Sequence, residues 1–305
     1  MKRIRLGVSD LESSRLVYGC MRIAGDGTPG DRARGRRALQ AALEAGYTHF
    51  DHADLYGGGA CEALFGELLR EEPGLRDDLI ITSKCGIRLP DDPETEDPKR
   101  YDFSFEHIVR SVQGSLQRLN TDRLDLLLLH RPDYLFNAAE VATAFESLAE
   151  QGMVRHFGVS NFTPTQVELL QSQCDTPLLV NQVEINIDRL DAFEDGTLDQ
   201  CQHRRISPMA WCPLGGVAYP AWGGTLTPEG EQRIAVELAG QAERYGAEPW
   251  QVMLAWLLKH PAGILPIVGS TTPERIAAAP RALTFDYRRE DWYRLLEARR
   301  GQPVP

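Results

Sequence analysis

Short apolar segments alternate along the whole chain with segments whose apolar residues recur at helical spacing. The short segments are rich in residues favoured in strands, and glycine, proline or polar residues bound them. Leu124–Leu129 is almost entirely apolar, which is typical of a strand covered on both faces. The predicted strands are Leu16–Ile23, Thr48–Ala53, Leu79–Ser83, Leu124–Leu129, Arg155–Val159, Leu178–Ile185, Pro208–Cys212 and Ile264–Val268.

Amphipathic helices are predicted between these strands. Asp31 suits the N-cap of the first helix, and Gly46 suits the residue after its end. The sequence Thr163-Pro164-Thr165-Gln166 matches a capping box. The remaining helices are predicted at Glu62–Glu71, from Ser104 to Asn120, around Val141 to Leu148, at Leu198–Gln202, Glu229–Tyr245 and Pro249–His260, after Thr272-Pro273, and at Glu290–Arg299.

This alternation of eight strands with helices predicts an α/β fold, and the chain shows no linker or break in composition. We therefore expect residues 1–305 to form a single (β/α)8 TIM barrel domain, with a β-hairpin in residues 1–15 and two extra helices. A doubly wound sheet is the alternative fold. It is disfavoured because no G-x-G-x-x-G sequence follows the first strand.

Composition narrows the classes of partner. The chain has 305 residues and a net charge of −11, which argues against nucleic acid or an anionic membrane as the main partner. Its six cysteines are scattered without the spacing of a zinc site, and no apolar run reaches the ~20 residues of a membrane span. We expect a cytoplasmic protein without a resident metal, acting as a monomer or small homo-oligomer on a small molecule.

Titratable residues stand at the ends of neighbouring predicted strands, where a barrel of this kind builds its active site. Asp51 and Tyr56 end the second strand, Lys84 the third and His130 the fourth. We expect Lys84 to pair with Asp51 and to lower the pKa of Tyr56 from its reference of about 10, which makes the phenol a better acid. On its own, the stretch around Asp51 and Tyr56 is equally compatible with a buried aspartate and a packing tyrosine.

The other strand ends suit a nicotinamide cofactor. Ser160, Asn161 and Gln182 have the donors and acceptors to hold a carboxamide, and Trp211 offers a flat face for an aromatic ring. A helix start with hydroxyls and a guanidinium suits a phosphate monoester. Each of these residues is more often structural when considered singly, so their joint placement carries the prediction. The residues of the helix start are Ser270, Thr271, Thr272 and Arg275.

Six segments resemble the aldo-keto reductases, in the order of that family and over most of the chain. The resemblance, which is nearest to a bacterial oxidoreductase branch, implies a catalytic tetrad in which Tyr56 is the general acid/base, assisted by Asp51, Lys84 and His130. The segments are Phe50 to Gly57, Ile81 to Lys84, Leu127 to Asp133, Phe157 to Phe162, Asn181 to Glu184 and Ile267 to Ser270.

The resemblance also implies the cofactor and its contacts. NADPH/NADP+ is expected across the barrel mouth with its nicotinamide on Trp211, and Ser270 and Arg275 match positions that take the 2′-phosphate, so NADPH is expected in preference to NADH. The implied activity is reduction of aldehyde or ketone carbonyls to alcohols. The other implied contacts are Gly19, Met21, Arg22, Ser160, Asn161, Gln182, Pro213, Leu214, Gly216, Gly269, Thr271 and Thr272.

The sequence departs from the family at three places. His52 replaces a small hydroxyl residue, and Ala278 and Ala279 replace polar adenine contacts. The tail after Arg300 is too short for the long loop that shapes the substrate pocket in some branches, so we expect an open pocket, bordered by a predicted loop from Arg88 to Phe103 and by Gly215 to Thr225. The two alternatives to a reductase are a metal-dependent hydrolase and a non-catalytic barrel. A metal-dependent hydrolase would need His49 and His52 on one face, whereas a strand points them to opposite faces. A non-catalytic, NADP(H)-binding regulatory or scaffold barrel is compatible with the fold but not favoured by the complete tetrad.

Overall fold

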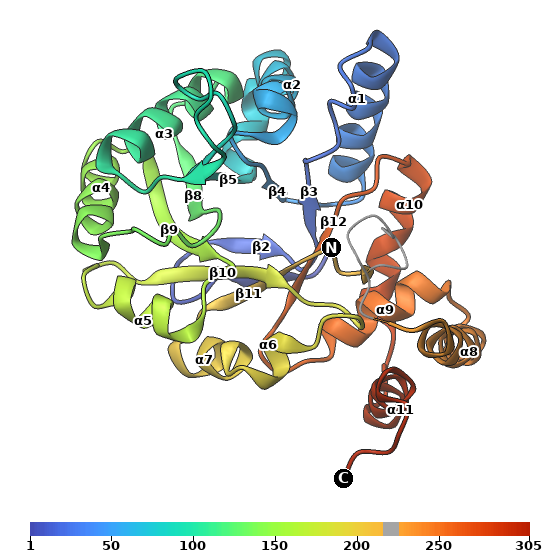
Figure 1. The fold of residues 1–305 in the computed structure, drawn as a ribbon. Coiled ribbons are helices and arrows are strands. Elements are labelled where there is room, and N and C mark those ends of the chain that lie inside the picture. The colour runs from blue at the N-terminus through green and yellow to red at the C-terminus, as the bar shows by residue number, and fades with distance from the viewer. Residues whose placement is uncertain (216–225) are drawn as a thin grey trace.

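A closed barrel of parallel strands forms the centre of the molecule. The structure is a computed structural model that describes residues 1–215 and 226–305. Within these residues the strands close the barrel in the order β10-β11-β12-β3-β4-β5-β8-β9, which confirms the predicted TIM barrel (Figure 1). The barrel strands are β3 (Val17–Gly19), β4 (His49–Asp51), β5 (Ile80–Cys85), β8 (Leu124–Leu129), β9 (Val154–Ser160), β10 (Leu178–Glu184), β11 (Ser207–Trp211) and β12 (Leu265–Val268).

Helices surround the barrel and connect its strands (Figure 1). The capping box at Thr163 and Gln166 is present with both of its hydrogen bonds, as predicted. The helices are α1 (Pro29–Glu44), α2 (Ala60–Glu71), α3 (Phe105–Leu119), α4 (Ala138–Glu150), α5 (Pro164–Gln171), α6 (Asp191–Glu194), α7 (Thr197–Arg204), α8 (Pro228–Tyr245), α9 (Pro249–Leu258), α10 (Pro273–Ala278) and α11 (Arg289–Arg300).

The predicted N-terminal hairpin is formed by β1 (Arg3–Arg5) and β2 (Glu12–Ser14), which pair antiparallel. Its Leu6 and Leu11 are buried with residues of the barrel interior, and the amide of Gly7 donates to the Ser207 hydroxyl at the start of β11. The hairpin therefore covers the N-terminal ends of the strands, which leaves their C-terminal ends for the polar residues.

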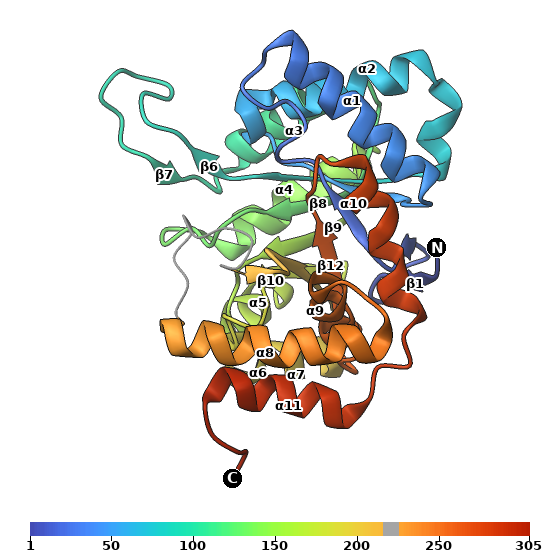
Figure 2. The same ribbon diagram turned by 90° about the vertical axis from the view of Figure 1, so that its right-hand side faces the viewer.

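Two helices lie outside the repeating pattern, as predicted. Helix α8 precedes α9 between β11 and β12, and α11 follows α10 and runs beside α8 (Figure 2). Asp291 of α11 is buried and accepts from Arg244 and from the Tyr245 hydroxyl of α8, the latter at 2.6 Å. The buried carboxylate of Asp291 therefore holds the C-terminal helix against α8.

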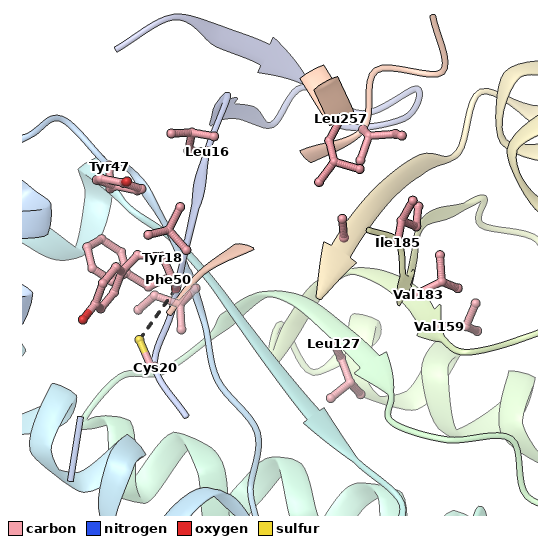
Figure 3. Close-up of a cluster of buried hydrophobic side chains, with 14 of the residues drawn as sticks. Leu16, Tyr18, Cys20, Tyr47, Phe50, Leu127, Val159, Val183, Ile185 and Leu257 are labelled. Atoms are coloured by element: carbon pink, nitrogen blue, oxygen red, sulfur yellow. Dashed lines mark hydrogen bonds between the residues drawn. The ribbon is translucent and has the colours of Figure 1, made fainter. Parts of the chain in front are cut away.

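Apolar packing between strands and helices holds the second strand in place. Phe50 of β4 contacts Tyr18 of β3, with ring centroids 5.8 Å apart, and the Tyr47 ring lies 6.0 Å from that of Tyr18 (Figure 3). On α2, Phe65 meets the Phe50 ring at 5.0 Å. This packing fixes Asp51, whose side chain points to the opposite face of the strand from Phe50.

Three details differ from the sequence prediction. Thr28, not Asp31, is the N-cap of α1, because Pro29 occupies the first helical position and the Thr28 hydroxyl accepts from the Asp31 amide. The first two barrel strands are shorter than predicted. The predicted loop after Arg88 contains a small hairpin, β6 (Ile87–Arg88) with β7 (Arg100–Tyr101), that projects from the barrel (Figure 2).

Candidate active site

Lys84 lies at the centre of the predicted tetrad. It extends from the buried strand β5, and its side chain is fully buried. Its ammonium donates to Asp51 Oδ2 at 2.8 Å, to the His52 carbonyl at 2.7 Å and to the Tyr56 hydroxyl at 3.1 Å. All three N–H donors of the lysine are therefore used, and one of them is on the predicted acid.

The turn after β4 brings Tyr56 back over the strand end. Tyr56–Gly59 forms a 3-10 turn in which Gly57 and Gly58 have φ values of 58° and 62°, a region that favours glycine. Gly59, at φ 90°, lies directly on Arg118, since a Cβ there would be 2.7 Å from the arginine side chain. The three glycines thus allow the backbone conformation of this turn, and Arg118 of α3 packs against it.

Burial and charge act in opposite directions on the two central groups. Burial raises the pKa of Tyr56, and the charge of Lys84 lowers it without cancelling the effect of burial. The predicted net lowering of this pKa is therefore wrong for the cofactor-free protein, although Lys84 acts in the predicted direction. For Lys84, burial lowers the pKa, but Asp51 and Tyr56 outweigh it and leave the pKa raised, so the lysine stays charged.

His130 completes the tetrad from the end of β8. Its ring lies edge-on to that of Tyr56, with centroids 5.8 Å apart. Burial, together with the charge of Lys84, lowers the pKa of His130 well below its usual value, so the imidazole is neutral. Its buried Nδ1 has no hydrogen-bond partner among the described residues. A neutral imidazole here can donate to an oxygen without placing a second cation beside Lys84.

The residues predicted to hold the carboxamide form one hydrogen-bonded chain. Ser160 Oγ donates to the Gln182 carbonyl at 2.7 Å, and Asn161 Nδ2 donates to Ser160 Oγ at 2.8 Å. The Trp211 indole donates to Asn161 Oδ1 at 2.9 Å. Gln182 Nε2 in turn donates to Asp51 Oδ1 at 2.8 Å. The structure therefore brings this predicted group and the tetrad together.

A second predicted group lies where β3 and β12 end. Gly19 pairs in register with Asp51, and Gly269 lies against Arg22, since a Cβ on Gly269 would be 3.1 Å from its guanidinium. The Ser270 carbonyl accepts from the Tyr18 hydroxyl. Arg275 is exposed, and its guanidinium makes no ion pair or hydrogen bond with the described residues.

The other predicted contacts follow the ends of strands β3, β11 and β12. Met21 is exposed, and its carbonyl accepts from Cys61. Pro213 and Leu214 follow Trp211, and Thr271 and Thr272 precede α10. Gly216, with the predicted pocket border beyond Gly215, lies outside the described residues. The predicted adenine-side alanines lie at the end of α10, where Ala279 is buried and the Ala278 carbonyl accepts from Gln251.

Sequence reasoning missed Arg131. Its guanidinium lies over the Trp211 ring, 5.2 Å from the centroid, and its charge contributes to the lowered pKa of His130. The available signal was its position immediately after His130 at a strand end. Arg131 therefore adds a cation to the mouth of the site.

His49 and His52 contact different layers, as their spacing predicts. His49 contacts the hydroxyls of Ser13 and Thr82 at 2.9 and 2.7 Å, whereas the fully buried His52 packs on Phe65 at 4.8 Å. Burial lowers the pKa of each imidazole to about 3. In residues 1–215 and 226–305 no cluster of His, Cys, Asp and Glu has metal-binding geometry.

Comparison with known proteins identifies the family. The sequence profile of the Aldo/keto reductase family matches residues 15–300. The chain belongs to this family. It is 43% identical to oxidoreductase YdhF of Escherichia coli over the full length of both chains. It is also 41% identical to a 6-dehydroglucose reductase of Agrobacterium fabrum, over 98% of this chain and 99% of the relative.

A solved structure supports the same assignment. An aldo/keto reductase from Klebsiella pneumoniae, in complex with NADP and acetate, superposes with a TM-score of 0.78 at 26% identity, covering 100% of this chain and 96% of that one. Like its relatives, this aldo-keto reductase is an NAD(P)-dependent oxidoreductase. No helix in the described part of the chain has the length and apolarity to cross a membrane.

Proposed function

We propose that this aldo-keto reductase uses NADPH to reduce aldehyde or ketone carbonyls to alcohols, with Tyr56 as the general acid. The observation that carries the proposal is the Lys84 ammonium, which contacts Asp51 and Tyr56 at 2.8 and 3.1 Å in a fully buried position. A positive charge at this distance stabilises the phenolate that remains once the proton has left.

The proton step uses three side chains. Tyr56 donates its hydroxyl proton to the carbonyl oxygen, and neutral His130 donates an N–H to the same oxygen as negative charge develops there. Asp51 balances the charge of Lys84 and keeps it beside the phenol. Solvent returns a proton to Tyr56 after the alcohol leaves, and the same steps in reverse oxidise an alcohol.

The residues present fit a nicotinamide dinucleotide. When bound, NADPH supplies the hydride that reduces the carbonyl carbon. Gln182 Oε1, which accepts no hydrogen bond from the described residues, suits the carboxamide together with Ser160 and Asn161, and Trp211 suits the ring. The exposed guanidinium of Arg275, with Ser270, suits a 2′-phosphate and thus favours NADPH over NADH.

Oxidation of NADPH with a panel of aldehydes and ketones tests the proposal. The panel includes 6-dehydroglucose, the compound named in the Agrobacterium relative. We expect saturable NADPH consumption with at least one carbonyl. NADPH binding, followed by fluorescence, without turnover of any carbonyl would favour the non-catalytic barrel, and absence of both would overturn the proposal. A cytoplasmic location, no nucleic-acid partner and a monomer or small homo-oligomer remain our predictions.

A further inference from the structure

Asp51 is held by a residue of the adjacent strand and by a residue from the opposite side of the barrel. Lys84 of the neighbouring strand β5 donates to its Oδ2, and Gln182 of β10 donates to its Oδ1, each at 2.8 Å. In the barrel order, β10 and β4 are separated by three strands in either direction, so Gln182 reaches Asp51 across the interior. Both side chains are 3% exposed, so water does not substitute easily for either contact.

The contact with Asp51 fixes which way the Gln182 amide faces. An ionised carboxylate only accepts hydrogen bonds, so the amide nitrogen must point to it and the amide oxygen must point away. That oxygen accepts no hydrogen bond from the described residues. The Gln182 backbone is fixed as well, because its carbonyl accepts from Ser160 Oγ at 2.7 Å and from the Asn161 amide at 2.9 Å.

We propose that Gln182 is a positioning residue for Asp51, in addition to its place in the cofactor site, and that it links carboxamide binding to the tetrad. Its Nε2 holds Asp51 Oδ1, while its Oε1 accepts the carboxamide N–H. The second half of this link rests on the proposed function, whereas the contact with Asp51 does not.

The link matters because Lys84 has no spare donor. Its three N–H groups are used by Asp51, the His52 carbonyl and Tyr56. Without the Gln182 N–H, Asp51 Oδ1 is left buried and unpaired. The carboxylate is then stabilised by turning so that both of its oxygens face the Lys84 ammonium. That movement draws the lysine away from Tyr56 and weakens the acid.

Thermal unfolding of the cofactor-free protein, measured from about pH 5 to about pH 8, tests the contact with Asp51. Gln182→Glu places a second carboxyl against Asp51, and like charges in contact raise its folded-state pKa above its unfolded value. Such a group stabilises the fold below its unfolded pKa and loses that effect as pH rises through the folded pKa. We expect the folded-to-unfolded ratio of Gln182→Glu to fall up to about tenfold per pH unit relative to wild type over this interval.

The Asp51→Asn background separates this contact from burial alone. In this background we expect Gln182→Glu to cause less than half of the pH-dependent loss of stability that it causes in the wild type, because the like charge on residue 51 is gone. An equal pH-dependent loss in both backgrounds would overturn the proposal. Gln182→Met, which keeps the length and removes both hydrogen-bonding groups, serves if Gln182→Glu does not fold. In that case additive stability losses of Gln182→Met and Asp51→Asn would contradict the coupling.

Kinetics test the link to the cofactor, with Ser160→Ala as the matched control. Ser160 belongs to the same hydrogen-bonded chain but does not touch Asp51. We expect Gln182→Met to lower kcat by at least tenfold and to shift the pH profile of kcat, while Ser160→Ala mainly raises the KM for NADPH. Identical patterns for the two variants would reduce Gln182 to a cofactor contact. An inactive wild type would instead refute the proposed function and leave the unfolding result standing.

Discussion

Replacement of Lys84 by methionine should separate what this lysine does for stability from what it does for the reaction. Methionine preserves most of the length and apolar character of the side chain but removes the ammonium. Asp51 is 3% exposed, and of the described residues only Gln182 would still donate to its carboxylate. Breaking a buried ion pair by removing one partner costs about 3–5 kcal/mol, because the remaining charge is uncompensated.

This loss is large but smaller than the total stability of many folded proteins, which is roughly 5–15 kcal/mol. We therefore expect Lys84→Met to fold with a clearly lower urea midpoint. Adding Asp51→Asn removes the unpaired charge, so the double variant should recover part of the loss. It should not recover activity, because Tyr56 lacks its cation in both variants, and loss of an assisted acid costs about 10²–10⁴ in rate.

Urea unfolding followed by circular dichroism, together with kcat/KM for a carbonyl substrate, measures both effects. The decisive comparison is Lys84→Met with the double variant. A loss below about 1 kcal/mol for Lys84→Met, or a double variant less stable than Lys84→Met, would refute the reasoning about the buried pair. Recovery of activity in the double variant would show that Lys84 does not assist Tyr56.

Two further substitutions test the surroundings of the tetrad. Arg275→Ala should weaken NADPH binding by about 1.5–3 kcal/mol and leave NADH binding nearly unchanged, with Arg281→Ala as a control. Equal losses of affinity for both cofactors, measured by calorimetry, would show that Arg275 does not bind the 2′-phosphate. His52 has a folded pKa of about 3, below its unfolded value, so the stability that it contributes is present above the unfolded pKa and declines as pH falls. The free energy of unfolding of His52→Phe should therefore rise relative to that of wild type by about 1.4 kcal/mol for each pH unit below about pH 6.5. Parallel pH profiles of stability for the two proteins would contradict this.

The sequence predicted strands and helix starts correctly where the segment itself has a distinctive residue pattern. The apolar run Leu124–Leu129 is a strand with every residue buried, and the capping box at Thr163 forms as its spacing indicates. The hairpin of β6 and β7 was missed because each strand has only two residues. Asp31 was misplaced as an N-cap because Thr28 with Pro29 is the better start.

That the candidate site residues lie together was predictable from the sequence, but their hydrogen-bond network was not. Strand ends brought Asp51, Lys84 and His130 together, because parallel strands present their C-terminal ends at one edge. The contact of Gln182 with Asp51 joins residues 131 positions apart across the barrel, and no spacing rule encodes it. The raised pKa of Tyr56 likewise depends on burial, which only the packed structure defines.

Turnover by Tyr56→Phe tests the central claim most directly. Phenylalanine keeps the ring beside His130 and removes only the hydroxyl that Lys84 contacts. With NADPH and a carbonyl that the wild type reduces, we predict a loss of at least about 10² in kcat, with NADPH affinity unchanged by fluorescence titration. Wild-type turnover by this variant would contradict the account, because the proton would then come from another group.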